Sequence, residues 1–151
     1  MMPFITKRKT PNGELIAVRS ERGLVSMGIA DGFEEAPAGA ADPDPVVGAA
    51  IERYFAGSTG ALDELEVDPS GTELQRRIWG LLRSIPPGET RSYGELGARV
   101  GTSGRVVGNA MAANPVCLAL PCHRVVRGDG SWHGYAFGNE RKRWLLEHES
   151  K

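Results

Sequence analysis

Residues 91–115, RSYGELGARVGTSGRVVGNAMAANP, predict two short helices joined by a tight turn. A capping-box pattern of Ser and Glu opens the first helix, which is expected over residues 92–100. Segment 101–104, which begins and ends with glycine, predicts the turn. The second helix is expected over residues 105–113, because Asn114-Pro115 ends it. This spacing is typical of a helix-turn-helix, and it also fits a plain helical hairpin inside a protein core.

The second of these helices, RVVGNAMAA, consists almost entirely of small side chains after its single arginine. Small side chains allow a helix to approach another backbone closely. That backbone is either a neighbouring helix or a nucleic-acid strand. Outward from this stretch, a capping box of Thr72 and Gln75 opens a helix whose apolar residues continue at helical spacing to Ile85. A last helix is expected over residues 140–149, with Trp144, Leu145 and His148 on one face.

The first half of the chain has a different pattern. Residues 4–9, 14–19 and 24–30 predict short strands, because glycine-containing turn sequences separate them. A helix is expected over residues 46–56, followed by a linker over residues 57–71. These patterns predict an α+β fold. A small N-terminal antiparallel sheet with a helix precedes a helical C-terminal part that contains a winged helix-turn-helix-like unit.

The composition is that of an ordinary globular domain, with 151 residues of which 40% are hydrophobic and 25% are charged. No apolar stretch reaches the roughly 20 residues that a membrane span needs, and residues 1–13 contain no apolar signal-peptide core. We therefore expect a cytoplasmic protein without a membrane partner. The net charge of −1 excludes a uniformly basic coat protein for nucleic acid. The basic excess within residues 123–143 is still compatible with a local basic face.

Cys122 is the candidate nucleophile, although a free cysteine beside an apolar run is usually a small core residue. The run 116–120 is expected to form a strand, so Cys122 would lie at the strand exit next to His123. An ordinary thiol, with a pKa of about 8.5, is only a few per cent ionised at pH 7 and needs a base. Neighbouring side chains of an extended chain point apart, so a water bridge from His123 is expected. Glu147 and Glu149 are the candidate carboxylates for orienting the imidazole.

The same Cys-His pair allows a peptidase, but peptidases usually place these two residues far apart in sequence. The two cysteines, Cys117 and Cys122, are five residues apart in a chain of cytosolic character, so a structural disulfide is not expected. They also lack the matching pair of histidines that a zinc site would need. No metal site is predicted.

The run NPVCLALPCHRVV, residues 114–126, resembles the active-site signature of the O6-alkylguanine-DNA alkyltransferases, also called methylated-DNA–protein-cysteine methyltransferases. Four further blocks resemble the same family in the same order. They are residues 71–79, 85–93, 105–111 and 134–149. The resemblance covers residues 67–149 and implies an alkyltransferase domain over residues 67–151. Residues 1–66 resemble the variable, RNase H-like N-terminal lobe of the family only in layout.

This resemblance implies a single-turnover methylated-DNA–[protein]-cysteine S-methyltransferase. The alkyl group of O6-alkylguanine in DNA, and also that of O4-alkylthymine, would move irreversibly to Cys122. His123 would accept the thiol proton through water, and Glu149 would hold the imidazole. Asn114 would shape the pocket, while Tyr93 would donate a proton to the departing guanine. No cofactor is implied, because the product is a stable thioether on the protein itself.

The resemblance also implies how DNA binds. The partner would be double-stranded DNA that contains O6-alkylguanine, bound through its minor groove by a monomer. The O6 atom lies inside the duplex, so the damaged base must leave the stack, and Arg105 would fill the space that it vacates. Further contacts to DNA or to the base are implied for Ala110, Met111, Val126, Tyr135 and Ala136.

Two positions depart from the family pattern. Ala112 stands where relatives often have Arg, which removes one phosphate contact and lowers the expected salt dependence of DNA binding. Phe137 stands beside the pocket where relatives usually have Gly, so its ring would narrow the entrance or offer a stacking surface.

Two other functions fit parts of the sequence. A lesion sensor of the alkyltransferase-like type would replace the nucleophile, which this chain retains as Cys122. A winged-helix regulator would need more base-reading side chains than residues 105–113 carry.

Overall fold

The structure is a computed structural model that describes residues 3–30, 44–129 and 135–151. The chain forms two compact units. The first unit comprises Met1–Pro69 and Pro115–Ala119, and the second comprises Ser70–Asn114 and Leu120–Lys151. The sequence did not indicate that the short segment Pro115–Ala119 belongs with the first half of the chain. The domain division expected between residues 66 and 67, and the RNase H-like character of the first domain, stay predictions.

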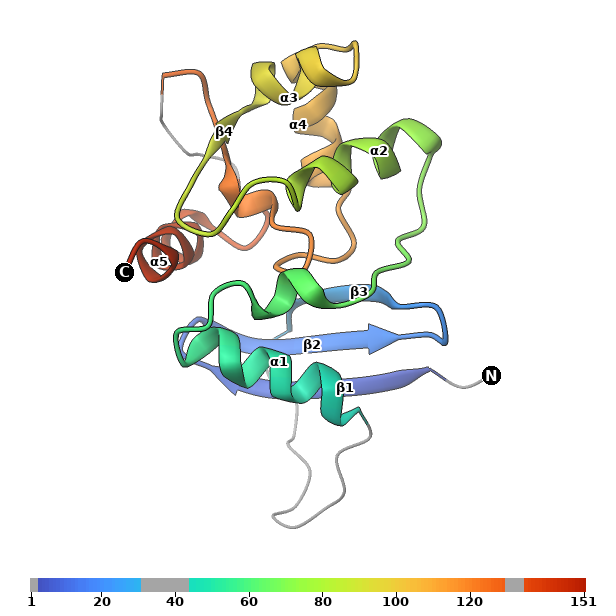
Figure 1. Cartoon of the computed structure of the whole chain (residues 1–151), viewed down its shortest axis with the longest axis vertical. Coiled ribbons are helices and arrows are strands. Elements are labelled where there is room, and N and C mark those ends of the chain that lie inside the picture. Colours follow the sequence, from blue (N-terminus) through green and yellow to red (C-terminus); the bar gives the residue numbers. More distant parts are fainter. Residues whose placement is uncertain (1–2, 31–43, 130–134) are drawn as a thin grey trace. The chain divides into compact units, whose positions relative to one another are not determined.

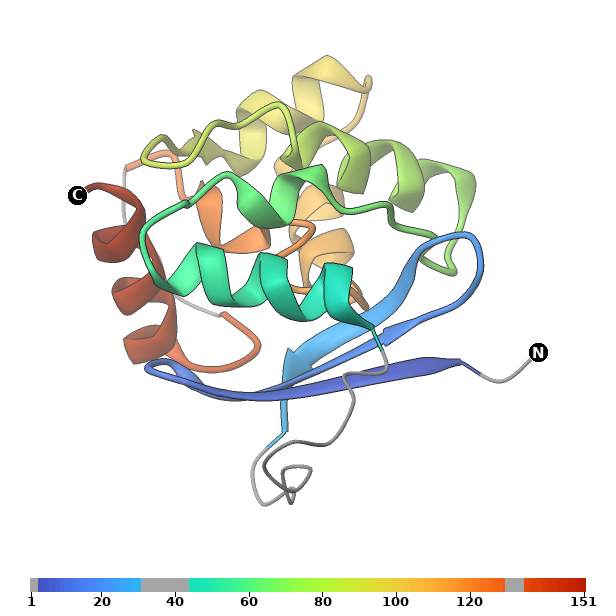
Figure 2. The ribbon, with the colours of Figure 1, turned by 60° about the horizontal axis from the view of Figure 1, so that its bottom comes forward.

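The first unit contains a three-stranded antiparallel sheet in the order β1-β2-β3, formed by Phe4–Thr10, Gly13–Arg19 and Leu24–Ile29. Gly13 ends the turn between β1 and β2 with a φ of 122°, a conformation that glycine adopts without steric cost. The helix α1, Pro45–Phe55, covers one face of the sheet (Figures 1 and 2). The three strands and the helix expected here are confirmed, with ends that differ by one residue.

Local chemistry determines where α1 begins. The Asp44 carboxylate accepts the Val47 amide, and Pro45 occupies the first turn, where no amide donor is needed. The buried Asp44 also accepts a 2.5 Å hydrogen bond from Arg19 on β2, which ties the helix start to the sheet. Buried residues of the sheet and of one helix face form the core of this unit: Leu15, Ala17, Leu24, Met27, Val47, Ala50, Ile51 and Tyr54.

Residues 57–71, expected to be a linker, contain ordered structure. The 3-10 helix η1, Ala61–Glu64, packs against α1 and buries Leu62. The backbone of Leu24 donates to the Glu66 carbonyl at 2.9 Å and accepts from the Asp68 amide at 2.7 Å. The segment therefore pairs with the start of β3, a long-range contact that its local sequence does not reveal.

The main helices of the second unit are α2 (Glu73–Leu82), α3 (Tyr93–Arg99), α4 (Gly104–Ala112) and α5 (Asn139–Glu149). The capping box of α2 is formed as predicted, because Thr72 Oγ1 accepts the Gln75 amide at 3.1 Å and Gln75 Oε1 accepts the Thr72 amide at 2.9 Å. Trp79 is 1% exposed, and its Nε1 donates to the Ala110 carbonyl at 2.8 Å. This hydrogen bond connects α2 to α4.

Helices α3 and α4 pack against each other across a tight turn, as the helix-turn-helix pattern predicts (Figure 1). Ser92 and Ser103 cap the two helices, each hydroxyl accepting an amide hydrogen of the first turn. Gly97 permits the close approach, because a Cβ atom there would lie 2.8 Å from the Thr102 carbonyl oxygen. Gly101 takes a φ of 72° in the turn, the left-handed conformation that favours glycine.

The strand expected over residues 116–120 is not formed, and that prediction is wrong. Val116 makes one isolated parallel bridge to Met27, and Leu118 has a φ of 78°, which interrupts an extended backbone. All five side chains of the run are buried, and a short apolar run does not by itself distinguish a strand from another buried segment. The chain then forms the 3-10 helix η2, Cys122–Arg124, and strand β5, Val125–Val126, which pairs in parallel with β4, Arg91–Ser92.

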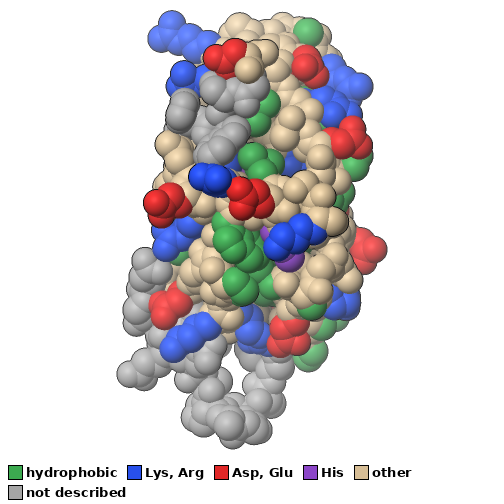
Figure 3. All heavy atoms as spheres, turned by 90° about the vertical axis from the view of Figure 1, so that its left-hand side faces the viewer, with side chains coloured by type: hydrophobic (Ala, Val, Ile, Leu, Met, Phe, Trp, Pro, Cys, Tyr) green, Lys and Arg blue, Asp and Glu red, His purple; other side chains and the backbone are tan. Residues whose placement is uncertain are grey.

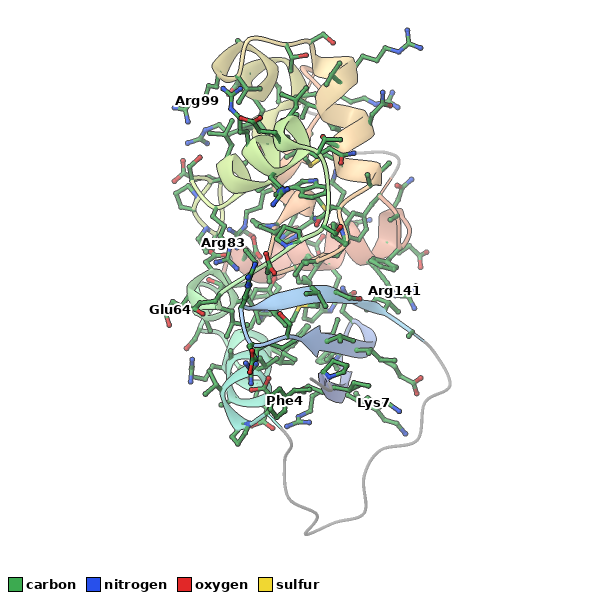
Figure 4. All side chains as sticks on the ribbon, turned by 90° about the vertical axis from the view of Figure 1, so that its right-hand side faces the viewer. Phe4, Lys7, Glu64, Arg83, Arg99 and Arg141 are labelled. Atoms are coloured by element: carbon green, nitrogen blue, oxygen red, sulfur yellow. The ribbon has the colours of Figure 1, made fainter. Side chains whose placement is uncertain are left out.

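No helix in the described part of the chain is long and apolar enough to cross a membrane. Basic and acidic side chains are interspersed over the face shown in Figure 3, in agreement with the net charge of −1. Arg99, at the end of α3, is one of the exposed cations of the second unit (Figure 4).

Candidate active site

Cys122 begins the 3-10 helix η2 and is 5% exposed. Two backbone hydrogen bonds hold this turn, from Cys122 N to Leu120 O at 2.8 Å and from Arg124 N to Pro121 O at 3.0 Å. The expectation that Cys122 follows a strand is wrong, because the preceding segment turns instead of pairing. The turn nevertheless brings the thiol to the wall of a cavity.

The cavity beside Cys122 has a volume of about 110 Å³ and lies within the second unit. Gly108 and Ala112 line it from α4, so the small side chains of that helix leave the space open. The other lining residues are Tyr93, Met111, Cys122, Tyr135, Ala136 and Lys142. The fold thus brings the candidate nucleophile and four other predicted site residues, Tyr93, Met111, Tyr135 and Ala136, around one space.

His123 and Glu149 form a buried hydrogen-bonded pair. His123 Nε2 lies 2.8 Å from Glu149 Oε2, and both side chains are 0% exposed. Of the two candidate carboxylates, Glu149 is therefore the one in contact, whereas Glu147 pairs with Arg143 at the surface. The other ring nitrogen of His123, Nδ1, is buried and makes no hydrogen bond to any described residue. A buried nitrogen of this kind normally has a partner, so Nδ1 is available for one.

Arg124 holds the same carboxylate from the other side. Its Nε donates to Glu149 Oε1 at 2.7 Å, its Nη2 donates to Oε2 at 3.1 Å, and its Nη1 donates to the Ile85 carbonyl at 2.8 Å. Burial raises the pKa of Glu149, but the hydrogen bonds and charges of His123 and Arg124 outweigh burial and lower that pKa to about 2. Glu149 is therefore ionised at neutral pH. Arg124 was not predicted as a site residue, because its only signal in the sequence is its place directly after Cys122-His123.

The charge of Cys122 affects the pKa of two other ionisable groups that line the cavity, Tyr93 and Lys142. Burial raises the pKa of the Tyr93 phenol, the charge of Cys122 raises it further, and Arg127 lowers it only in part. Burial lowers the pKa of Lys142, and the charge of Cys122 offsets part of this change. The Tyr93 phenol therefore keeps its proton at neutral pH and can serve as a hydrogen-bond donor.

Asn114 stabilises the chain just before the nucleophile. Its Nδ2 donates to the Leu120 carbonyl at 2.9 Å, and its backbone amide donates to the Met111 carbonyl at 3.2 Å. Residues 115–119 belong to the first unit, whereas Asn114 and Leu120 belong to the second. The Asn114 side chain therefore connects the two residues of the second unit that flank this segment. Asn114 thereby positions the backbone that leads into Cys122.

A family model for the DNA-binding domain of 6-O-methylguanine DNA methyltransferase matches residues 73–151. The chain belongs to the 6-O-methylguanine DNA methyltransferase family. The methylated-DNA–protein-cysteine methyltransferase of Salmonella typhimurium is 48% identical to this family member over 98 residues, which cover 64% of this chain. The chain spans 57% of the length of that relative. The protein of the same name from Mycobacterium tuberculosis strain H37Rv is 46% identical over 112 residues, or 72% of this chain and 67% of the relative.

Solved structures of the methyltransferase family share the fold of the whole chain. The crystal structure of Mycobacterium tuberculosis O6-methylguanine methyltransferase has a TM-score of 0.81 at 34% identity, covering 99% of this chain and 93% of that one. A crystal structure of Mycobacterium tuberculosis OGT in complex with DNA has a TM-score of 0.79 at 35% identity, covering 96% and 92%. The α+β fold expected from the sequence is confirmed.

The residues of this methyltransferase family member that were predicted to contact DNA lie in different settings. Arg105 is exposed in the first turn of α4, where a cation opposes the helix dipole, so local stability does not explain it. Ala110 is 2% exposed, and its carbonyl already accepts a hydrogen bond from Trp79. Val126 is 7% exposed on β5. The predicted contacts of these residues with DNA stay predictions.

Lys142 is a second site residue that sequence reasoning missed. Lys142, Leu145 and Glu149 are the buried residues of α5, and they follow one another at helical spacing. The sequence pattern instead predicts Trp144, Leu145 and His148 on one face of this helix. Trp144 and His148 stack on each other with ring centroids 4.8 Å apart, and only Leu145 of these three is fully buried. The inward face is hard to recognise because two of its three members are charged.

Phe137 supports one wall of the cavity. Its ring packs edge-to-face on Tyr135, with centroids 5.8 Å apart and an interplanar angle of 73°. Arg141, labelled in Figure 4, donates to the Phe137 carbonyl at 3.2 Å. The effect of Phe137 on the range of accepted alkyl groups stays a prediction. Gly134, which begins the last of the family-like blocks, lies outside the described residues.

Proposed function

We propose that this protein repairs alkylated DNA directly, by moving the alkyl group of O6-alkylguanine to Cys122 in a single turnover. The cavity carries the proposal, because it places Cys122 beside Tyr93 while Glu149 holds the residue next to the nucleophile, His123. The name of these relatives, methylated-DNA–protein-cysteine methyltransferase, describes transfer from DNA to a protein cysteine. This is the chemistry that a buried thiol on a cavity wall can perform when a base lies nearby.

The thiol must lose its proton before it attacks carbon. We assign the base to His123 Nδ1, acting through one water molecule, because Nδ1 is buried with no other described partner. Glu149 accepts from Nε2, which favours the tautomer that leaves a lone pair on Nδ1. The thiol proton passes through the water to Nδ1, and the ionised Glu149 stabilises the imidazolium that forms.

The transfer itself is a displacement at carbon. The Cys122 sulfur forms a bond to the alkyl carbon while the bond from that carbon to O6 breaks, and the electron pair of the broken bond stays on guanine. Guanine takes up a proton from the Tyr93 phenol, whose raised pKa keeps it protonated until that moment. The proton held by His123 then restores the phenol through solvent. The product is a thioether without a good leaving group, so each molecule acts once.

Double-stranded DNA is the proposed partner, bound through its minor groove by α3 and α4 of a monomer. The O6 edge of guanine faces the inside of the duplex, so the base must swing out to reach Cys122. Arg105 is exposed at the start of α4 and enters the base stack in its place. The backbone near Val126 and the residues Tyr135 and Ala136 hold the base in the cavity. Ala110 and Met111 on α4 are the further proposed contacts to DNA or to the base.

O4-alkylthymine is proposed as a second substrate, and the cytoplasm as the location. The same displacement at carbon applies to an alkyl group on O4 of thymine, because that oxygen also leaves as part of a conjugated base.

The domain division of residues 1–66 and 67–151 is likewise proposed, with Cys122, His123 and Glu149 all in the second domain.

The proposal is tested with the full chain and a duplex that contains a single O6-methylguanine. We expect a mass gain of one methyl group in place of a hydrogen, reaching one methyl per protein molecule. Cys117 and Cys122 fall in the same tryptic peptide, residues 106–124, so fragment ions must locate the methyl on Cys122.

Two variants serve as controls. Cys122→Ser should transfer nothing yet still bind the duplex, whereas Cys117→Ser should transfer normally. An unchanged mass in the unmodified protein, together with tight binding to the lesion, would refute alkyl transfer and favour a lesion sensor.

A further inference from the structure

Lys142 carries a buried charge without a carboxylate partner among the described residues. Its side chain is 1% exposed, and Nζ donates a 2.7 Å hydrogen bond to the Val125 carbonyl. An ammonium group loses its hydration on burial and is normally paired with an acid there. The buried carboxylate of the same helix, Glu149, is already bound by His123 and Arg124. Structural stability therefore does not explain a lysine at this position.

The location of Lys142 along α5 is also unfavourable for a cation. The helix begins at Asn139, and the Lys142 amide donates to the carbonyl of its N-cap, Gly138, at 3.2 Å. Lys142 therefore lies in the first turn, where the helix dipole presents its positive end. A compensating negative charge has to come from another part of the structure.

The cavity supplies that charge. Lys142 and Cys122 line the same space, and the hydrogen bond to Val125 holds the lysine against the segment that begins with the nucleophile. We propose that the Lys142 ammonium stabilises the Cys122 thiolate and so acts as a positioning residue for the nucleophile. This inference rests on the proposed role of Cys122 as the alkyl acceptor.

The coupling between the two groups is reciprocal. The charge of Cys122 raises the pKa of Lys142 against the larger effect of burial, so the ammonium must favour the thiolate by the same amount. The other titratable or charged groups around the cavity are Tyr93 from α3, His123 and Arg124 from η2, Arg127 after β5, and Glu149 from α5.

Lys142 differs from the other cations of this group. Glu149 compensates Arg124, and solvent screens the exposed Arg127. The lysine is thus the buried positive charge in the described part of the site that no carboxylate neutralises.

The test measures ionisation of the thiol without DNA. The rate at which iodoacetamide alkylates Cys122 is followed against pH in the full chain, with Cys117→Ser as the common background. The acid limb of this profile is the pH range over which the rate falls as the thiolate takes up a proton. Lys142→Gln keeps a hydrogen-bond donor but removes the charge, so we expect it to shift the acid limb upward by about one pH unit. At a pH within the acid limb, its alkylation rate should be roughly tenfold lower than that of the parent protein. Lys142→Arg, which keeps the charge, should largely retain the original limb.

Arg143→Gln is the matched control, because it removes an exposed cation from the next position of the same helix and should leave the limb in place. Thermal melting establishes that each variant is folded, and Lys142→Met replaces Lys142→Gln if the latter does not fold. The inference is overturned if the charge-removing variant has the profile of the parent protein. It is also overturned if Lys142→Arg shifts the profile as far as Lys142→Gln, because the role would then be structural.

Transfer from methylated duplex is measured in parallel on the same variants. An unshifted limb with normal transfer to Cys122 refutes the role of Lys142 and leaves the proposed function standing. If Lys142→Gln shifts the acid limb but the unmodified protein transfers no methyl group, the proposed function is refuted instead.

Discussion

The carboxylate of Glu149, the last residue of α5, lies 2.8 Å from the Nε2 atom of His123, which precedes it by 26 residues. Both side chains are 0% exposed, and Arg124 binds the same carboxylate through two hydrogen bonds. The docking of the C-terminal helix therefore determines the orientation of the imidazole beside Cys122. Changes at the end of the chain should reach the chemistry of the thiol through this pair.

Replacing Glu149 by glutamine should slow alkyl transfer. The amide has nearly the same shape but no charge, so it neither fixes the imidazole tautomer as well nor stabilises the imidazolium. We expect the single-turnover rate with methylated duplex to fall roughly 10–100-fold at neutral pH. Glu147→Gln changes an exposed carboxylate two residues away and should leave the rate unaltered. Equal rates for the two variants would contradict the assigned role of Glu149.

The pKa of Glu149 predicts how stability depends on pH. The folded-state pKa is lowered from 4.5 to about 2, so the ionised carboxylate stabilises the fold fully above pH 4.5 and loses this effect as the pH falls toward 2. The contribution at neutral pH is on the order of 3 kcal/mol. Urea unfolding of the parent protein and of Glu149→Gln should give free energies of unfolding that converge as the pH falls through this window. A difference that stays constant with pH would show that ionisation of Glu149 does not cause the pH dependence of stability.

Arg105→Ala should weaken repair of duplex DNA more than reaction with the free base O6-methylguanine. Only the duplex requires the base to leave the stack, which costs a few kcal/mol that an inserted side chain partly offsets. We expect a loss of roughly tenfold or more with duplex and little change with the free base. Arg53→Ala removes an exposed cation from α1 and serves as the control. Equal losses on both substrates would argue against a role in extrusion.

Gly97→Ala should destabilise the helix-turn-helix. The new Cβ atom would lie 2.8 Å from backbone atoms of Thr102 and Ser103, which cannot move without separating α3 from α4. We expect the free energy of unfolding to fall by about 1–3 kcal/mol, with weaker DNA binding. Gly80→Ala, in an exposed position of α2 with no atom near its Cβ, should gain about 0.5–1 kcal/mol. Urea unfolding distinguishes the two, and equal stabilities would show that the helices tolerate a wider spacing.

The sequence by itself determined the elements whose ends depend on local interactions. The capping box of Thr72 and Gln75 and the hydroxyl cap of Ser92 involve residues three positions apart, so their patterns are visible in the sequence and are present in the structure. The three strands of the first unit likewise follow from the glycine-containing turn sequences that separate them. The motif around Cys122 identified the candidate nucleophile.

Only the tertiary structure decided which groups surround that nucleophile. Residues 116–120 are apolar, which is enough to predict that they are buried. Their local sequence does not show that they make a single bridge to β3 instead of forming a strand. The choice of Glu149 over Glu147, and the burial of Arg124 and Lys142, depend on how α5 packs against segments far away in sequence. A local sequence pattern reflects interactions between residues a few positions apart. The contacts of Glu149, Arg124 and Lys142 instead join residues far apart in sequence, which come together only when the core packs.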